Sequence, residues 1–307
     1  MKTVLIAGGS GLIGSRLSQL LSEKGYSVRW LSRNPSQGSP YPAFSWDPDR
    51  GEMDMRALEG TDAVINLAGA GIAEGRWTAQ RKALIISSRV NSTLLLAQKI
   101  GELPHPPKVY LSGAAIGIYG DRGDEKLDES SRPGSTGFLA ESCKQWEAAI
   151  EELSAKLPIR TCFLRIGLVL SEKGGALPKI KLPFYLGQGA YFGHGRQWYS
   201  WVHIDDVCGM FMTALENERW SGVYNATAPE PVTNRVLTRM VGRVWFRFFI
   251  KIPIPVPAFV LKLVLGEMSE TVLSSARVYP KRALEAGYTF GFPELEVGLR
   301  DLKARKL

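Results

Sequence analysis

The chain has 307 residues, of which 45% are hydrophobic and 22% are charged, as in ordinary globular proteins. This composition excludes a disordered, collagen-like or disulfide-scaffold chain, and the length is near the upper limit for one hydrophobic core. The net charge of +8 is uneven, because from Arg235 onward 13 Lys and Arg stand against six Asp and Glu, a net charge of +7. This distribution argues against a dedicated nucleic-acid-binding domain and permits an acidic partner at the basic C-terminal region.

Cysteine spacing and hydropathy indicate the compartment. Cys143, Cys162 and Cys208 are far apart and form no CxxC motif, which excludes a disulfide framework and a structural zinc site. The most apolar later stretch, Phe248–Leu265, is interrupted by lysines and prolines, so no segment reaches the roughly 20 apolar residues of a membrane span. We expect a cytoplasmic protein with no membrane span and no metal site.

Predicted strands and helices alternate along the chain. Apolar runs predict strands at Thr3–Ala7, Ser27–Leu31, Ala63–Leu67, Lys108–Ser112 and Thr161–Leu170. Helical periodicity predicts helices at Leu12–Lys24, Arg81–Ile100 and Glu141–Leu157, and a later helix–strand pair at Ile204–Glu216 and Val223–Ala226. Strands joined by long crossovers require a parallel sheet with helices on both faces. The predicted fold is therefore α/β, a Rossmann-type doubly wound, mostly parallel sheet with a smaller C-terminal lobe.

The first predicted strand runs directly into Gly8-Gly9-Ser10-Gly11-Leu12-Ile13-Gly14, where the first helix begins. In the GxxGxxG pattern Gly8 turns tightly, Gly11 lets a pyrophosphate approach the backbone, and Gly14 lets the helix pack closely on the strand. The helix N-terminus adds free N–H donors and a partial positive charge. The pattern predicts a dinucleotide site; the alternative is merely a tight strand–helix turn.

Two further strand ends bear on the cofactor. The second predicted strand ends at Ser32-Arg33, where NAD sites usually place an acidic residue, whereas an arginine accommodates the 2′-phosphate of NADP. These residues favour NADP, unless Arg33 is only a solvated loop residue. The strand ending at Asn66-Leu67-Ala68-Gly69 offers small side chains over which a ribose and a phosphate can lie.

Four motifs occur in the order typical of the extended, epimerase-like branch of the short-chain dehydrogenase/reductase superfamily, which this chain resembles. They are the glycine loop, NLAG, VYLSGAAIGIYG (Val109–Gly120) and WVHIDDV (Trp201–Val207). The C-terminal sequence VPAFVLKLVLGEMSETVLSSARVYPKRALEAGYTFGFPELEVGL is similar to the C-terminal domain of one subgroup, "epimerase family" proteins sometimes described as cell-division-inhibitor-like. The resemblance implies an NADP-binding Rossmann domain at residues 1–170, with 203–228 returning to the sheet. It also implies a lobe at residues 171–202 and 229–307 that caps a substrate pocket.

The resemblance also places cofactor contacts at Ser32, Arg33, Leu67, Ala68, Arg89 and the strand end near Val169. Arg89 lies on the helix after NLAG and can reach a phosphate, although a surface helix arginine is an equal alternative. The predicted cofactor-binding residues are Gly8, Ser10, Gly11, Leu12, Ile13, Gly14, Ser32, Arg33, Asn66, Leu67, Ala68, Gly69, Arg89 and Val169.

The usual acid–base set of the superfamily is absent. Active members place a lysine four residues after a tyrosine and so lower the pKa of the phenol toward neutrality, a shift worth roughly 4 kcal/mol. None of the ten tyrosines here is followed by a lysine at that spacing. Alignment on Glu147 puts Leu139 at the tyrosine position and Cys143 at the lysine position, while the serine position falls near Ala114. The sequence assigns no catalytic residue.

Several residues have open interpretations. Tyr119 can line the pocket and His203 can titrate near neutral pH, although a packing or structural role is favoured for both. Trp198, Tyr199 and Trp201 can stack on a planar ligand or be buried under the C-terminal lobe. A basic, aromatic-rich stripe can bind a membrane surface or an acidic partner, but a solvated helix face is favoured because prolines follow. The stripe consists of Arg235, Arg239, Arg243, Arg247 and Lys251.

Two functions remain open. The leading hypothesis is an NADP-dependent, epimerase-like oxidoreductase that acts on a small molecule with a non-standard proton donor. The alternative is an NADPH-binding sensor or regulatory protein with little turnover, which the family resemblance links to cell division. The missing Tyr–Lys pair favours the alternative, whereas the cofactor loop favours neither.

Overall fold

The computed structural model describes residues 1–36, 38–246 and 253–305. Its centre is an eight-stranded sheet in which all neighbouring strands run parallel except the last pair, β3 and β4. In spatial order the strands are β14 (Gly222–Ala226), β8 (Arg160–Ile166), β6 (Val109–Ala115), β5 (Ala63–Asn66), β1 (Thr3–Ala7), β2 (Ser27–Ser32), β3 (Ala43–Asp47) and β4 (Glu52–Met53).

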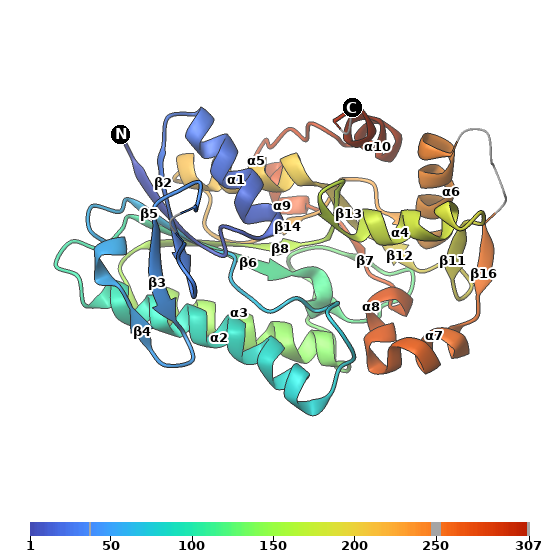
Figure 1. The fold of residues 1–307 in the computed structure, drawn as a ribbon, viewed down its shortest axis with the longest axis horizontal. Coiled ribbons are helices and arrows are strands. Elements are labelled where there is room, and N and C mark those ends of the chain that lie inside the picture. The colour runs from blue at the N-terminus through green and yellow to red at the C-terminus, as the bar shows by residue number, and fades with distance from the viewer. Residues whose placement is uncertain (37, 247–252, 306–307) are drawn as a thin grey trace.

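Helices cover both faces of the sheet, as Figure 1 shows. One face carries α1 (Leu12–Glu23) and α5 (Ile204–Glu216), and the other carries α2 (Ala79–Gly101) and α3 (Phe138–Lys156). Alternate residues of β1 enter the two layers, since Val4 packs with the α1 side and Leu5 with the α2 side. Because both faces are buried, the strand sequence is continuously apolar. The predicted doubly wound α/β fold is confirmed.

The predicted strand Thr161–Leu170 is two strands in different sheets. The chain leaves the central sheet at Gly167, where a Cβ atom would overlap the Ser200 carbonyl oxygen. The next residue, Leu168, donates its N–H to that same carbonyl at 2.8 Å. From there β9 (Leu168–Ser171) forms a small sheet with β10 (Gly174–Gly175) and β13 (Trp201–His203). A continuous apolar run therefore concealed a change of sheet.

The strands β3 and β4 were not predicted. Their segment contains Asp and Pro residues that are typical of turns, and β3 lies near the sheet edge, where periodicity is weak. Its register comes from β2, because Trp30 pairs with Ala43 and Leu31 with Phe44. Buried Trp46 then anchors the strand in the core on the α2 side.

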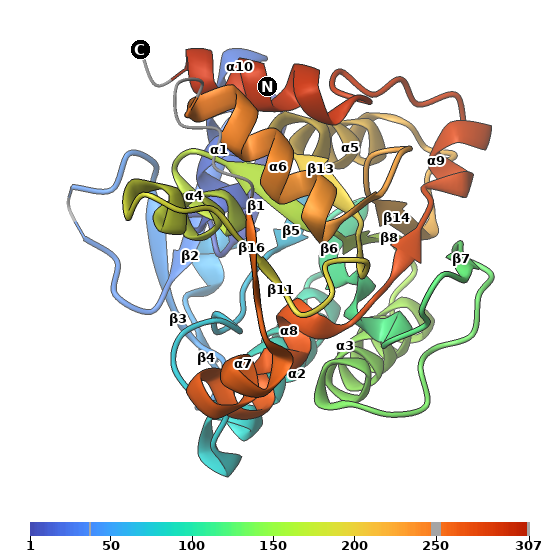
Figure 2. The ribbon, with the colours of Figure 1, turned by 90° about the vertical axis from the view of Figure 1, so that its right-hand side faces the viewer.

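The remaining elements lie mainly at one end of the molecule, which faces the viewer in Figure 2. They are β7 (Lys126–Leu127), α4 (Ala176–Tyr185), β11 (Ala190–Phe192), β12 (Trp198–Tyr199), β15 (Val232–Thr233), α6 (Asn234–Trp245), β16 (Ile254–Val256), α7 (Ala258–Leu265), α8 (Glu270–Leu273), β17 (Arg277–Val278), α9 (Lys281–Glu285) and α10 (Leu295–Ala304). Short 3₁₀ helices follow Asp54 (Met55–Ala57), β6 (Ile116–Tyr119) and α7 (Gly266–Ser269). The predicted domain limits, 1–170 with 203–228 against 171–202 with 229–307, stay a prediction.

The crossing at Gly167 predicts a stability cost for any side chain there. We expect Gly167→Ala to lower the free energy of unfolding by about 1–3 kcal/mol, because its methyl group must displace the Ser200 backbone. Urea unfolding measures this loss. Gly38→Ala is the matched control, since a Cβ there meets no atom within 4 Å. Equal stability of the two variants would contradict the explanation for the change of sheet.

Candidate functional site

The loop between β1 and α1 is shaped by glycines whose missing side chains leave room for backbone atoms. Gly8 has φ +78°, and a Cβ there would lie 2.7 Å from the Leu67 carbonyl oxygen. A Cβ on Gly14 would overlap the Gly8 carbonyl oxygen, so only glycine lets α1 approach β1 this closely. Gly11 differs, because its Cβ would meet only the Gly8 carbonyl oxygen, at 3.2 Å, and the residue is exposed. The loop therefore packs against backbone atoms at Gly8 and Gly14 and is open to solvent at Gly11.

The N-terminus of α1 offers free N–H donors at this open side. No side chain caps the helix, and no acidic residue stands in its first turn. Ser10 and Gly11, directly before the helix, are both exposed. Unbonded N–H groups and the positive end of the helix dipole favour an anion such as a phosphate group.

A fourth glycine in the loop has a role that the motif did not reveal. A Cβ on Gly9 would overlap the indole ring of Trp30 on β2. The Trp30 ring is fixed from both sides, because its Nε1 donates to Ser18 Oγ at 2.8 Å and its ring packs 5.1 Å from Tyr41. The sequence contained a signal for this contact, because Gly9 directly follows Gly8 and a tryptophan, Trp30, stands on the neighbouring strand.

The NLAG turn lies directly beside the glycine loop, because Ala7 at the end of β1 pairs with Asn66 at the end of β5. Asn66 itself is buried and shapes the turn: its Oδ1 accepts from the Ala68 N–H at 3.1 Å, and its Nδ2 donates to Tyr110 at 3.1 Å. Strand β1 has β2 on one side and β5 on the other, so the order of the strands reverses at β1. Ligands of open α/β sheets bind at this kind of switch point.

Two arginines stand at this edge without an acidic partner among the described residues. Arg33 is exposed at the end of β2, next to Ser32, whose hydroxyl accepts from the Asn34 N–H at 3.2 Å. Arg89 of α2 lies 5.1 Å over the Trp146 ring and donates to the Ile85 carbonyl at 2.8 Å. It also packs against the NLAG turn, since a Cβ on Gly69 would be 3.0 Å from its guanidinium carbon.

Arg89 is therefore not a surface arginine. Burial lowers the pKa of its guanidinium, and in the described part of the chain no carboxylate forms an ion pair with it. A partly buried cation without a counter-ion is costly unless an anion joins it. The chemistry of Arg33, Arg89 and the α1 N-terminus fits a ligand with several phosphate groups.

The hairpin of β9 and β10 closes the other side of the loop. A Cβ on Gly175 would lie 3.1 Å from both the Leu12 side chain and the Val169 carbonyl oxygen. Leu12 and Ile13, at the start of α1, pack with Val169 in one cluster. Val169 thus lies beside the beginning of α1, and its predicted contact with the cofactor stays a prediction.

The positions of the missing Tyr–Lys pair hold packing residues. Leu139 and Cys143 both face Gly117, where a Cβ would lie 3.4 Å from each. Burial raises the pKa of the Cys143 thiol to about 12, so this residue carries no charge near neutral pH. Leu139 and Cys143 are the residues that the alignment on Glu147 places at the tyrosine and lysine positions.

Tyr119 is enclosed rather than lining a pocket. Its side chain is fully buried, with the hydroxyl 2.8 Å from Asn225 Oδ1 and accepting from Arg165 Nη1 at 2.9 Å. Burial raises the pKa of Tyr119. Arg165 in turn forms a buried ion pair with Glu147 at 2.7 Å. The packing interpretation of Tyr119 is the correct one.

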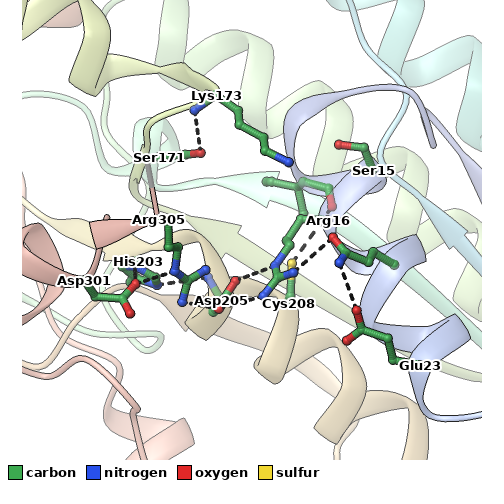
Figure 3. A network of polar contacts seen from close by, with 12 residues as sticks. Ser15, Arg16, Glu23, Ser171, Lys173, His203, Asp205, Cys208, Asp301 and Arg305 are labelled. Atoms are coloured by element: carbon green, nitrogen blue, oxygen red, sulfur yellow. Dashed lines mark hydrogen bonds and ion pairs between the residues drawn. The ribbon is translucent and has the colours of Figure 1, made fainter. Parts of the chain in front are cut away.

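His203 is also structural, as Figure 3 shows. Its Nδ1 caps α5 by accepting from the Asp205 N–H at 3.2 Å, so Nε2 carries the proton and faces Asp301 Oδ2 at 3.2 Å. The ring is fully buried against Phe292, with centroids 3.8 Å apart. Burial lowers the pKa of His203 to about 4, so the ring is neutral at physiological pH.

Around His203, a charged chain joins distant parts of the sequence (Figure 3). Arg16 of α1 binds Asp205 with two hydrogen bonds of 2.8 and 3.0 Å. Arg305 binds Asp205 at 2.7 Å and Asp301 at 2.6 Å. Burial alone would raise the pKa of Asp205, but the hydrogen bonds from the two arginines hold it well below its usual range. This network ties the segment after α10 to α1 and α5.

The aromatic cluster is used internally. Trp198 donates to Asp124 at 2.7 Å and carries Arg277 4.1 Å over its ring. Tyr199 donates to the Val272 carbonyl at 2.7 Å, and Trp201 donates to the Glu230 carbonyl at 2.9 Å. Trp201 is buried, whereas Trp198 and Tyr199 are half-buried, and the polar atom of each of the three rings is bonded within the chain.

Of the predicted basic stripe, Arg235, Arg239 and Arg243 lie exposed on α6. Arg235 packs over Tyr191 at 4.5 Å, and Arg243 lies 3.8 Å from Glu296. Arg247 and Lys251 lie outside the described residues.

Sequence reasoning missed a contact between the C-terminal lobe and α3. Glu270 of α8 accepts from the Phe138 N–H at 3.2 Å, at a helix start that no side chain of α3 caps. Gly137 has φ +95°, and a Cβ there would overlap the Glu270 carboxylate. Burial raises the pKa of Glu270. The contact lies directly before Leu139, the residue that the sequence alignment places at the tyrosine position.

Other site types are not indicated. In the described part of the chain, no group of three His, Cys, Asp or Glu side chains is arranged to hold a metal ion. Over the same residues, no helix combines the length and apolar character needed to span a membrane.

Comparison with known proteins agrees with this geometry. The sequence model described as "NAD dependent epimerase/dehydratase family" matches residues 4–227, and "Domain of unknown function (DUF1731)" matches residues 256–302. The chain belongs to the NAD-dependent epimerase/dehydratase family. The resemblance identified from the motifs is thereby confirmed.

Individual family members match over almost the whole chain. Mouse epimerase family protein SDR39U1 is 36% identical over 311 residues, covering 98% of this chain and 99% of the relative. Epimerase family protein YfhF of Bacillus subtilis is 36% identical over 305 residues and 98% of each chain. The crystal structure of human SDR39U1 with NADPH has a TM-score of 0.85 and 34% identity, covering 99% of this chain and 100% of that one. UDP-glucuronic acid 4-epimerase of Bacillus cereus, at 16% identity and a TM-score of 0.79, shares the fold.

The buried, neutral His203 predicts acid sensitivity in this family member. Its pKa is about 4 in the folded chain and about 6.5 in an unfolded one, so between these values the unfolded state binds more protons. The free energy of unfolding should therefore fall as the pH drops through this window, by at most about 1.4 kcal/mol per pH unit. Urea unfolding between about pH 7 and about pH 5 measures this slope.

His203→Asn provides the control, because Asn also caps helices but does not titrate. The variant should be less stable at neutral pH and show a shallower pH slope than the wild type. A slope as steep as that of the wild type would assign the acid sensitivity to other groups.

Proposed function

We propose that this epimerase-family protein binds NADPH at the carboxyl edge of the central sheet. The observation that carries the proposal is the partly buried Arg89, a cation without a carboxylate partner that packs on the NLAG turn. The uncapped N-terminus of α1 lies at the same edge and favours an anion as well. The NADPH complex of human SDR39U1 supports the same cofactor.

Each predicted residue has a place in this arrangement. The backbone N–H groups of Gly11, Leu12 and Ile13 would hold the pyrophosphate, with Gly8, Ser10 and Gly14 forming the loop. Ser32 and Arg33 would bind the 2′-phosphate, because a guanidinium and a hydroxyl both donate to phosphate oxygens. Leu67, Ala68 and Gly69, positioned by Asn66, would leave space for the sugars, and Val169 would border the far end of the cofactor.

For the chemistry we propose an epimerase-like oxidoreductase that acts on a small molecule. Bound NADPH supplies a hydride. The chain itself orients the substrate and excludes water with the lobe of residues 171–202 and 229–307. Among the described residues, the two candidate proton donors are engaged elsewhere: Tyr119 in its bond to Asn225, and His203 at the start of α5. Proton transfer would then rely on solvent or substrate groups, which predicts slow turnover.

A second function has a specific observation in its favour. At the positions aligned with the acid–base pair stand half-buried Leu139 and buried Cys143, which pack together at Gly117 and offer no titrating group near neutral pH. The fold would then keep its cofactor edge without the catalytic pair. This combination suits an NADPH-binding sensor or regulatory protein, in which cofactor binding rather than turnover is the output. The basic C-terminal region would then be a surface for an acidic partner.

The cofactor preference is the first test. The wild type should bind NADPH more tightly than NADH by roughly tenfold or more, since one charge-assisted phosphate contact is worth about 1.5–3 kcal/mol. Arg33→Ala should remove most of this preference and leave the affinity for NADH nearly unchanged. Isothermal titration calorimetry measures all four affinities, and equal wild-type values for the two cofactors would refute the role of Arg33.

Turnover is the second test. Positioned acid–base groups contribute typically 10²–10⁴-fold, so we expect NADPH oxidation with sugar nucleotides, aldehydes and ketones to be slow or undetectable despite tight binding. Tyr119→Phe should lower thermal stability without changing any residual rate. Wild-type rates of roughly 1–10³ s⁻¹, ordinary for enzymes, would show that an efficient proton donor exists.

A further inference from the structure

The end of the molecule that faces the viewer in Figure 2 carries an unusual set of exposed apolar side chains. On α7, Phe259, Leu263 and Val264 are 72%, 73% and 61% exposed. On α4, the side chains of Leu182, Tyr185 and Leu186 are 59–82% exposed. Leu261 is the buried residue of α7, so this helix is apolar on its solvent side as well.

The elements that carry these side chains are connected to one another. Helix α4 packs on α6, α6 packs on β11, and β11 pairs with β16 through Ala190 and Ile254. Ile254 is itself 52% exposed, and β16 leads directly into α7. Figure 2 shows α4, α6, β16 and α7 on the same side of the molecule. We call the exposed apolar side chains of α4, β16 and α7 the apolar face.

The apolar face is held in place by the backbone of α7. Arg76, in the loop before α2, donates to the Leu263 carbonyl at 2.6 Å and to the Val264 carbonyl at 3.2 Å. The C-terminal end of α7 is therefore attached to the loop before α2 through its carbonyl groups. A helix whose backbone is held in this way needs little further ordering when it meets a partner.

The sequence around the elements of the apolar face is rich in cations. Residues 173–204 and 231–266 contain no Asp or Glu, although exposed Glu267 lies just after α7 and pairs with Lys82 at 2.7 Å. They contain exposed cations, among them Lys179 on α4, Arg239 on α6 and Lys262 on α7. In the described part of the chain, neither Arg239 nor Lys262 forms an ion pair. An apolar surface on which cations outnumber carboxylates is complementary to an anionic surface with an apolar layer behind it.

We propose that the apolar face docks on an anionic lipid membrane, with its Leu, Phe and Tyr side chains in the interface and its cations on the head groups. Large protruding apolar groups together with basic residues are the features of proteins that lie on membranes. A second copy of the chain fits poorly, because a symmetric contact would place the same cations against one another. An acidic protein partner, which would offer pockets for such anchors, is distinguished from a lipid surface by the last of the tests below. This inference does not depend on the proposed cofactor.

Vesicle sedimentation tests the proposal with the full chain. Binding to vesicles of phosphatidylcholine mixed with phosphatidylserine should exceed binding to phosphatidylcholine alone. It should weaken with salt, since the Debye length falls from about 10 Å at 0.1 M to about 3 Å at 1 M. Phe259→Ser with Leu263→Ser should weaken binding about tenfold or more. Arg239→Gln with Lys262→Gln should weaken it about fivefold for each cation.

Matched controls carry the same changes elsewhere on the surface. Leu284→Ser with Val297→Ser removes two half-exposed apolar groups of α9 and α10, and Lys24→Gln with Arg50→Gln removes two exposed cations. Both controls should bind as the wild type does, and the thermal midpoints of all variants should match because the changed positions are exposed.

Several outcomes would overturn the proposal. They are equal binding to both vesicle types, equal losses in the control and test variants, and a loss caused by the charge changes alone. A dimer that the Phe259 and Leu263 changes abolish, seen by sedimentation velocity without lipid, would assign the face to a second copy. Binding to polyglutamate as tight as to the vesicles, with the same dependence on Phe259 and Leu263, would assign it to an acidic protein.

Discussion

The close approach of α1 to β1 is the constraint on which the site depends. The Gly8 carbonyl oxygen occupies the space that a side chain at position 14 would need, and Gly8 itself fits under the Leu67 backbone only without a Cβ. These two contacts fix the helix axis so that its N-terminus points along the carboxyl edge of the sheet. The NLAG turn and the hairpin of β9 and β10 both pack beside the start of that helix. Arg89 packs on the NLAG turn and so lies at the same edge.

Some charged groups of the protein form structural ion pairs, and others are placed where they can bind an anion. Arg165 with Glu147, and Arg16 with Asp205, form ion pairs that join elements far apart in sequence. Arg33 and Arg89 lack such partners among the described residues and stand where anions would bind. Tyr119 and His203 are structural as well, because the Tyr119 hydroxyl bonds Asn225 and His203 Nδ1 accepts from the Asp205 N–H. The edge of the sheet is therefore cationic but poor in groups that can move a proton.

Sequence patterns predicted those features of the fold that depend on residues close together in the chain. The order of strands and helices, the turn at Gly8 and the packing at Gly14 follow from apolar periodicity and glycine spacing. The split at Gly167 could not be predicted, because it depends on the Ser200 carbonyl of another sheet. The stacking of the Arg89 guanidinium on the Trp146 ring, and the close approach of the Trp30 ring to the Gly9 backbone, likewise arise between separate elements. Strand β3 was missed because its register is set by β2 rather than by its own sequence pattern.

The Asp205 network has a consequence for how the chain folds during synthesis. Its two arginines, Arg16 and Arg305, bind the same carboxylate from opposite parts of the sequence. A ribosome that adds about 5–20 residues per second releases Arg305 roughly 5–20 s after Asp205. In that interval Asp205 has only Arg16 as a partner, and His203 lacks the contact with Asp301. The network can therefore be completed only after nearly the whole chain has left the ribosome.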